Sequence, residues 1–225
     1  MELFILIIPL FIAFAIFSSI AAHKRAQQRK ATLAAWATSR GLSFQPDKVY
    51  GFDNEHPGLS CLQYGRNRYA YNIVSGRRGD QFMIAFDYHY ETESRDSDGD
   101  TTTTHHYFSA VLLQPMHPLK PLLIRREGFF DKIKAGFGFN DIDFESAEFS
   151  KRYYVTAPDK RWAYDVLNTR SMQLILDQPK HYTIEFDHEV VCIADDDEME
   201  AFGFEHAYKF GAALLDGIPD FAKRA

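Results

Sequence analysis

Three carboxylates, Asp87, Asp143 and Glu145, come nearest to acid–base chemistry in this chain. Asp143 and Glu145 are two positions apart, which places both side chains on one face of an extended strand, where they could share a proton or act as a general acid and base. The same spacing suits an exposed face with Ile142 and Phe144 turned into the core. Because no nucleophile or oxyanion element accompanies these carboxylates, we favour the exposed face and keep a catalytic role as the alternative.

Histidines on two expected strands raise the question of a metal site. His89 lies on one strand, and His105 and His106 lie on the next. Adjacent residues of a strand point to opposite faces, so at most one member of the pair can approach His89. No cysteine or further histidine is spaced to complete a ligand set, and the sequence therefore predicts no metal site.

Two acidic runs have the composition of cation-binding segments. Asp96 to Asp100 alternates oxygen ligands as a calcium loop does, but its glycine is in the fourth place instead of the sixth, and Tyr107 stands where the closing glutamate belongs. We expect it to be part of a solvated, exposed loop from Thr92 to Thr104.

The run Asp195 to Glu198, with Glu200, directly precedes an apolar helix, so we expect these carboxylates to cap that helix and complement its dipole.

The local motifs that carry nucleotide, serine-hydrolase or zinc-protease chemistry are absent from the sequence. It contains no G-x-S-x-G, no P-loop, no G-x-G-x-x-G and no H-E-x-x-H. Cys61 and Cys192 are the only cysteines, and each lies among apolar residues outside any C-x-x-C motif. This is typical of buried thiols in a reducing compartment, although a single disulfide between them stays open. We expect no cofactor.

Charge is distributed unevenly along the chain. The net charge is −6, but Lys24, Arg25, Arg29 and Lys30 form a basic collar near the N-terminus. From residue 31 onward, 21 Lys and Arg face 30 Asp and Glu, a net charge of −9. An acidic domain repels nucleic-acid phosphates, so we expect no nucleic-acid partner. The collar suits contact with anionic membrane lipid, at about 1 kcal/mol for each basic side chain.

The segment from Leu3 through Ile12 to Ala22 is long and apolar enough for a transmembrane helix. Its twenty consecutive residues are uncharged, and a helix of that length spans a hydrocarbon core of about 30 Å. The basic collar follows it, so the positive-inside rule predicts a single-pass protein of the inner (plasma) membrane with its domain in the cytoplasm. A signal peptide cleaved after Ala21 and Ala22, which would export the domain, is the alternative.

We expect a transmembrane helix over residues 1–22, a juxtamembrane basic helix over 23–41 that continues it, and a soluble domain over 42–225. Hydrophobic periodicity within the domain predicts an α+β fold with antiparallel sheet(s) and packed helices. The expected strands are 42–44, 67–74, 81–91, 105–114, 122–126, 153–156, 182–186 and 190–194, and the expected helices are 129–134, 159–167, 172–176 and 198–215. Residues 42–126 and 150–225 could be two related halves.

Three short motifs follow one another along the domain. They are Phe86-Asp87-Tyr88-His89-Tyr90, Ile142-Asp143-Phe144-Glu145-Ser146, and Arg152-Tyr153-Tyr154-Val155 followed by Asp159, with Leu167 and Met172 continuing the order. This order, over roughly Lys24 to Ala194, resembles a bacterial family of single-pass membrane-anchored proteins of unknown function. The resemblance implies a bacterial inner-membrane protein with a cytoplasmic domain, and it implies no activity.

These observations favour a single-pass membrane protein without enzymatic activity, whose domain binds a protein partner or another membrane component. The alternative is a membrane-tethered hydrolase or cation-dependent enzyme that uses clustered carboxylates. That alternative requires Asp87, Asp143 and Glu145 to lie within hydrogen-bonding or metal-ligand reach of one another. A third hypothesis is that the basic collar senses anionic lipid surfaces.

Overall fold

The structure is a computed structural model that describes residues 2–97, 99–126 and 142–224, with side chains described over 16–97, 99–126 and 142–223. The expected helix over 129–134 lies outside the described residues. The side chains of residues 3–15, which make up most of the expected transmembrane segment, also lie outside the described part of the chain. Within the described part of the chain, no helix is both long and apolar enough to cross a membrane.

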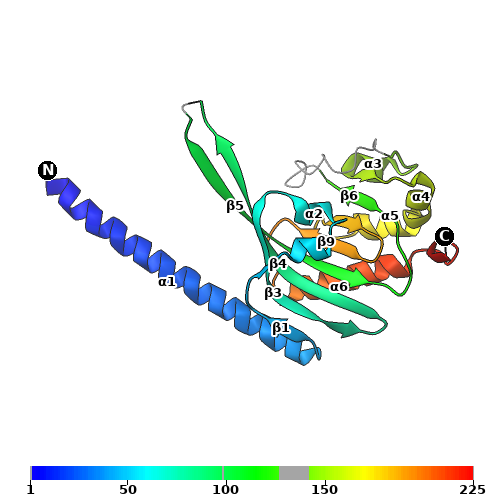
Figure 1. Ribbon diagram of the computed structural model, residues 1–225, viewed down its shortest axis with the longest axis horizontal. Coiled ribbons are helices and arrows are strands. Elements are labelled where there is room, and N and C mark those ends of the chain that lie inside the picture. The colour runs from blue at the N-terminus through cyan, green and yellow to red at the C-terminus, as the bar shows by residue number, and fades with distance from the viewer. Residues whose placement is uncertain (1, 98, 127–141, 225) are drawn as a thin grey trace.

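The N-terminal part of the chain is one helix, α1 (Glu2–Ser39), which extends far beyond the domain in Figure 1. The two helices expected over residues 1–22 and 23–41 are therefore a single rod. Gly41 follows its end with a φ of 67°, the left-handed conformation that glycine adopts readily after a helix.

The strands of the described residues form a single nine-stranded antiparallel sheet, which confirms the α+β class. Its order is β1-β3-β4-β5-β9-β8-β6-β7, and β2 also pairs with β3. The strands expected over 67–74, 81–91 and 105–114 form the meander β3–β4–β5, and those expected over 182–186 and 190–194 form the hairpin β8–β9. The pairing of β5 with β9 joins the N-terminal and C-terminal strands into one sheet. The strands are β1 (Ser43–Gln45), β2 (Val49–Tyr50), β3 (Arg66–Arg78), β4 (Gln81–Arg95), β5 (Thr101–Gln114), β6 (Leu122–Arg125), β7 (Tyr154–Thr156), β8 (Thr183–Phe186) and β9 (Val191–Asp195).

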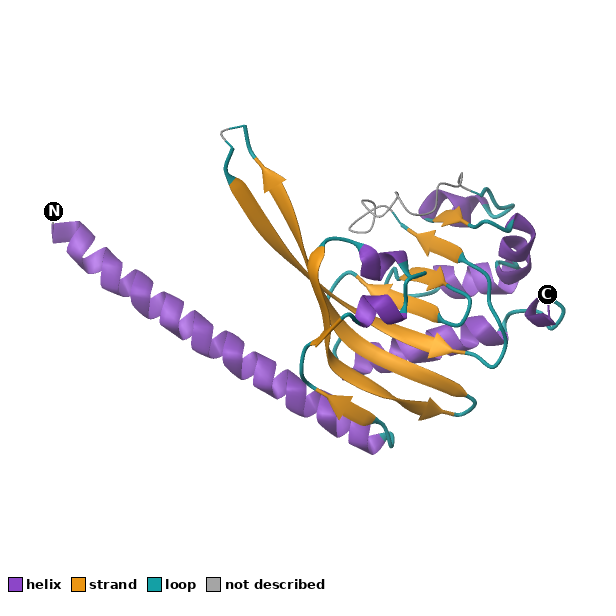
Figure 2. Ribbon diagram, in the orientation of Figure 1, coloured by secondary structure: helices purple, strands orange, loops and turns teal. Residues whose placement is uncertain are grey.

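The prediction of a loop over residues 92–104 is wrong. β4 and β5 stay paired as far as Arg95 and Thr101, and they form the long ribbon that projects beyond the sheet in Figure 2. The four consecutive threonines are β-branched and favour an extended backbone, while their polarity reflects exposure on the ribbon. Asp96, Ser97, Gly99 and Asp100 are the described residues between the two strands. The β3–β4 connection is likewise shorter than expected, because Arg78 already pairs with Gln81 across Gly79 and Asp80.

Side chains alternate between two buried faces of the sheet. On β4, Met83 and Ala85 join the larger core, whereas Phe86 and Tyr88 join a second core beneath the short helices η1 and α2. The larger core also receives α1 and α6. The remaining helices are η1 (Phe52–Glu55), α2 (Ser60–Gln63), α3 (Ala147–Arg152), α4 (Lys160–Val166), α5 (Thr169–Leu176), α6 (Ala201–Asp216) and η3 (Ala222–Arg224). By the same alternation, Asp87 lies on the α1 and α6 face.

The second half of α1 is fixed to the domain through α6. Trp36 stacks on Phe204 with ring centroids 5.9 Å apart, and its indole Nε1 donates to Glu205 Oε2 at 3.4 Å. Arg78 of β3 holds the same carboxylate with two hydrogen bonds, at 2.8 and 3.1 Å. Glu205 thus ties α1, β3 and α6 together.

Candidate functional site

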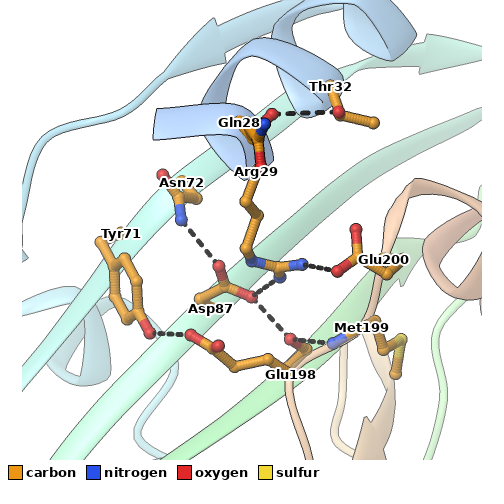
Figure 3. Close-up of polar contacts among 10 residues, drawn as sticks. Gln28, Arg29, Thr32, Tyr71, Asn72, Asp87, Glu198, Met199 and Glu200 are labelled. Atoms are coloured by element: carbon orange, nitrogen blue, oxygen red, sulfur yellow. Dashed lines mark hydrogen bonds and ion pairs between the residues drawn. The ribbon is translucent and has the colours of Figure 1, made fainter. Parts of the chain in front are cut away.

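A buried ion pair joins the middle of α1 to the centre of the sheet (Figure 3). Arg29 Nη2 donates to Asp87 Oδ1 at 2.7 Å, and the side chains of Arg29 and Asp87 are 12% and 0% exposed. The carboxylate also accepts from the hydroxyl of Ser109 at 2.6 Å and from the amide of Asn72 at 2.8 Å. Three donors from α1, β5 and β3 therefore satisfy a charge that would be costly to bury alone.

The register of the sheet places these donors. Asp87 lies opposite Tyr71 on β3 and opposite Ser109 on β5. Asn72 follows Tyr71 at an irregularity of the β3–β4 pairing, where it has a φ of 50°, a conformation that asparagine tolerates better than most residues. Ser109 in turn accepts from the backbone N–H of Met199 at 2.8 Å, so the segment before α6 is attached to the same cluster.

Burial and the neighbouring charges shift the pKa values of Asp87 and Arg29 in opposite directions. Burial raises the pKa of Asp87, while Arg29 and the hydrogen bonds from Ser109 and Asn72 work against that rise. Burial alone would lower the pKa of Arg29, but the carboxylates of Asp87, Glu198 and Glu200 together outweigh it, and the pKa of Arg29 lies above its usual value. The guanidinium therefore stays charged and supplies the counter-charge that Asp87 needs.

A cleft of about 580 Å³ lies beside the pair, between α1 and the sheet. Ala22 is at one end of its lining, cations of α1 such as Arg25 and Lys30 form one wall, and Glu198 and Glu200 contribute to the other. Tyr71 donates to Glu198 at 2.6 Å, and Glu200 lies 3.5 Å from Arg29. Cations, carboxylates, amides and hydroxyls thus line the cleft, a set suited to recognising a charged or polar partner.

Three buried polar atoms at the cleft have no hydrogen-bond partner among the described residues. They are Arg29 Nε, Arg29 Nη1 and Asn72 Oδ1, and both residues line the cleft. Because buried donors and acceptors are nearly always satisfied, a water molecule or a ligand group is the natural partner for each.

The basic collar divides into two kinds of residue. Lys24 and Arg25 are exposed on α1, and Lys30 is half-buried there. Arg29 instead points at Asp87, so its charge serves the interior of the protein. No local pattern distinguishes Arg29 from the other three, because charge alone groups the four residues.

The catalytic carboxylates considered above are not brought together. Asp87 is fully buried among Arg29, Asn72 and Ser109. Asp143 and Glu145 are exposed in an irregular segment before α3, with Ile142 and Phe144 buried, as the exposed-face interpretation predicts. That segment is not one of the strands, since Ile142 makes a backbone bond to Val155 without extending the ladder.

The acidic run before α6 does not cap the helix as expected. α6 begins at Ala201, and Glu200 occupies the cap position without a side-chain hydrogen bond to the helix. The carboxylates have other partners, because Asp195 pairs with Lys180 and Glu198 accepts from Tyr71. Tertiary partners have thus taken the carboxylates that a local pattern assigned to the helix end.

The expectation for the histidines is confirmed in part. His105 faces His89, with 3.0 Å between His105 Nδ1 and His89 Nε2, while His106 turns to the opposite face and bonds Thr92. Glu91 also lies 3.3 Å from His105. The sequence interpretation omitted Glu91, because the strand pairing that sets it opposite His105 fell at the edge of the expected loop.

The two cysteines are buried, as expected, and their thiols are free. Cys61 Sγ lies 3.8 Å from Cys192 Sγ in the second core. Nearby, the fully buried Glu185 accepts from the backbone N–H groups of Ser60 and Cys61 at 2.7 and 3.2 Å. This buried carboxylate holds the start of α2 against the sheet.

No model of a known protein family matches the chain, and no curated protein matches it. One solved structure shares its fold. It is the crystal structure of the mycobacterial trehalose monomycolate transport factor A, TtfA, which matches 84% of this chain and 91% of its own length with a TM-score of 0.58. The two sequences are 10% identical, so the likeness to this bacterial protein is one of fold.

Proposed function

We propose that this chain is a membrane-anchored accessory protein without enzymatic activity, whose domain binds a protein partner or another membrane component in the cleft beside α1. In this proposal residues 3–22 span the inner membrane and the domain lies in the cytoplasm. Lys24, Arg25 and Lys30 contact anionic lipid at the surface, each contributing about 1 kcal/mol.

The observation that carries the proposal is the continuity of α1 together with its attachment at Arg29. The helix runs from Glu2 to Ser39 without a break, and the buried pair with Asp87 fixes it only seven residues after Ala22. An apolar segment held in this way is a rigid support and not a loose tether, so the domain has a set orientation at the membrane.

The position of the cleft supports binding at the membrane surface. Ala22, the last residue of the proposed span, lines it. A partner that is itself embedded in or attached to the bilayer could therefore reach the cations of α1 and the carboxylates Glu198 and Glu200 without leaving the membrane surface. The unpartnered atoms of Arg29 and Asn72 would complete their hydrogen bonding on such a partner.

The likeness of fold to TtfA, which is named as a transport factor, supports an accessory role. The placement of the carboxylates offers no support for an enzyme, because Asp87 is enclosed by its three donors whereas Asp143 and Glu145 are exposed elsewhere. The cleft is the feature to test, because function depends on a site and not on a fold.

Membrane attachment and orientation are tested first. The full-length chain is expected to stay with the membrane pellet after alkaline carbonate extraction, while a chain lacking residues 2–22 is expected to be released. Protease added to intact spheroplasts should leave the domain undigested until the cells are lysed. Release of the full-length chain, or digestion of the domain in intact spheroplasts, would contradict the proposed topology.

Binding in the cleft is tested by photocrosslinking in membranes. A photoreactive amino acid at Gln28, which lines the cleft, should give a discrete adduct, whose mass distinguishes a protein from a lipid. The matched control is the same substitution at the neighbouring exposed Gln27, which points away by about 100° around the helix. Equal adducts at both positions, or none at Gln28, would refute binding in the cleft.

A further inference from the structure

Three potential metal ligands converge on the ribbon formed by β4 and β5. Glu91 lies directly opposite His105 in the register, and His89 lies two positions earlier on β4, on the same face. One ligand atom from each of the three side chains lies within 4.8 Å of the others. His89 is 2% exposed, whereas the side chain of His105 is 54% exposed, so the set is buried on one side and open on the other.

The distances match the edges of a zinc coordination polyhedron. His89 Nε2 and His105 Nδ1 are 3.0 Å apart, and His105 Nδ1 lies 3.3 Å from Glu91 Oε1. Ligands bound tetrahedrally at about 2.0–2.1 Å from Zn²⁺ are about 3.3 Å from one another. We propose that His89, Glu91 and His105 form a binding site for a borderline divalent transition metal, with Zn²⁺ as the best-fitting ion.

A single residue orients two of the three ligands. The backbone carbonyl of Asn67 lies 3.1 Å from His89 Nδ1, and a carbonyl can only accept, so Nδ1 carries the proton and Nε2 presents its lone pair to the metal position. The side-chain amide of Asn67 donates to Glu91 Oε1 at 2.6 Å. Metal sites commonly hold a histidine by its second nitrogen and a carboxylate by a further hydrogen bond in this way.

The backbone at Asn67 adds a second sign that this arrangement is built. Asn67 has a φ of 49° and lies at an irregularity of the β3–β4 pairing, which turns its carbonyl towards His89. Such strained positions concentrate where a side chain or carbonyl must be aimed. Without metal, the His105 Nδ1–H can donate to His89 Nε2. With a metal bound at Nδ1, neutral His105 carries its proton on Nε2 instead.

The donor set selects the class of ion. Two imidazoles and one carboxylate suit Zn²⁺ and its neighbours and not Ca²⁺ or Mg²⁺, which prefer oxygen ligands. Three protein ligands leave a fourth position for water or for a donor from a partner, as in open zinc sites. The two cationic side chains near these ligands contact other groups: Arg66 pairs with Glu93, and Lys48 Nζ lies 4.2 Å from the centre of the Tyr69 ring.

The test is metal titration of the full-length chain in detergent micelles, prepared without a polyhistidine tag. Isothermal titration with Zn²⁺ should show one saturable site per chain, and Co²⁺ should develop the visible absorption of a four- or five-coordinate complex. His105→Ala and Glu91→Gln should each abolish the saturable site. Asn67→Gly keeps the backbone conformation and the carbonyl but removes the amide, and it should weaken Zn²⁺ binding by about 10–100-fold.

The matched control is His106→Ala, which removes the neighbouring histidine from the opposite face of the same ribbon. It should bind Zn²⁺ as the unmodified chain does. Circular dichroism of each variant checks that the fold persists, and Asn67→Gly gives a graded result if a ligand variant fails to fold. No saturable Zn²⁺ binding by the unmodified chain, unchanged binding by His105→Ala, or an equal loss in His106→Ala would overturn the site.

Discussion

Replacing Arg29 by Met should destabilise the domain strongly, because it leaves Asp87 buried without its counter-charge. The carboxylate is 0% exposed and would retain only the donors Ser109 and Asn72. Removing one partner of a buried ion pair costs about 3–5 kcal/mol. Replacing both members, as Arg29→Met with Asp87→Asn, should cost less than the sum of the single changes, with a coupling energy of about 0.5–3 kcal/mol.

The assay is urea unfolding of the full-length chain in detergent, followed by the fluorescence of Trp36. Trp36 stacks on Phe204 and reports the attachment of α1, and Trp162→Phe removes the only other tryptophan. Exposed Arg25, one turn earlier on α1, is the matched control, and Arg25→Met should change the free energy of unfolding by no more than about 0.5 kcal/mol.

The pH dependence of the Arg29→Met variant follows from the same pair. Burial already raises the pKa of Asp87, and loss of Arg29 raises it further. A carboxyl group whose pKa is higher in the folded than in the unfolded state favours folding while it is protonated. The deficit of the variant should therefore be small in acid and grow as the pH rises through the folded pKa. The reasoning would be refuted if the two single changes in unfolding free energy summed to that of the double variant. It would also be refuted if the loss of stability in Arg29→Met did not depend on pH.

Three further predictions follow from buried groups. If the domain is cytoplasmic, alkylation of the denatured chain from membranes should find both Cys61 and Cys192 free. A mild oxidant should link these thiols, whose sulfur atoms are 3.8 Å apart, and mass spectrometry should detect the disulfide. Burial lowers the pKa of His56 despite nearby carboxylates, so stability should be full above about pH 6.5 and fall as the pH drops below it; thermal unfolding of His56→Leu should show a shallower fall. A Cβ at Gly211 would lie 2.3 Å from Leu113 Cδ1, so Gly211→Ala should destabilise by about 1–3 kcal/mol in chemical denaturation.

Local patterns were sufficient for most elements of the fold. Alternation identified β3, β4 and β5, and the start of α4 at Asp159 follows from its side chain, which accepts from the N–H of Trp162. The short helices η1 and α2 were not among the expected elements. Glu185 holds the N–H groups at the start of α2 from 124 or more residues away, so no local signal marks it.

The ion pair and the place of Glu91 beside the histidines were missed for different reasons. Arg29 and Asp87 are 58 residues apart, and their meeting depends on how α1 docks, which side-chain periodicity does not encode. Glu91 and His105, by contrast, follow from the hairpin register alone. Treating residues 92–104 as a loop hid that register, because the expected strands ended at Glu91 and resumed at His105 just where the ladder in fact continues.

One row of side chains on the α1 face shows why chemistry collects at this end of the sheet. Along β5, Val111 and Leu113 are apolar and lie in the larger core, which also contains residues of α6. Ser109 comes next, where α1 supplies Arg29 to the adjacent Asp87. His105 lies farther out on the ribbon and is more than half exposed. Along this row the apolar core is followed first by a buried carboxylate with a charged partner and then by a side chain in contact with solvent. A polar side chain is therefore found where an ion-pair partner or water can satisfy it. The cleft and the proposed metal position occupy successive steps of this row, and each has its own partners, so variants can test them separately.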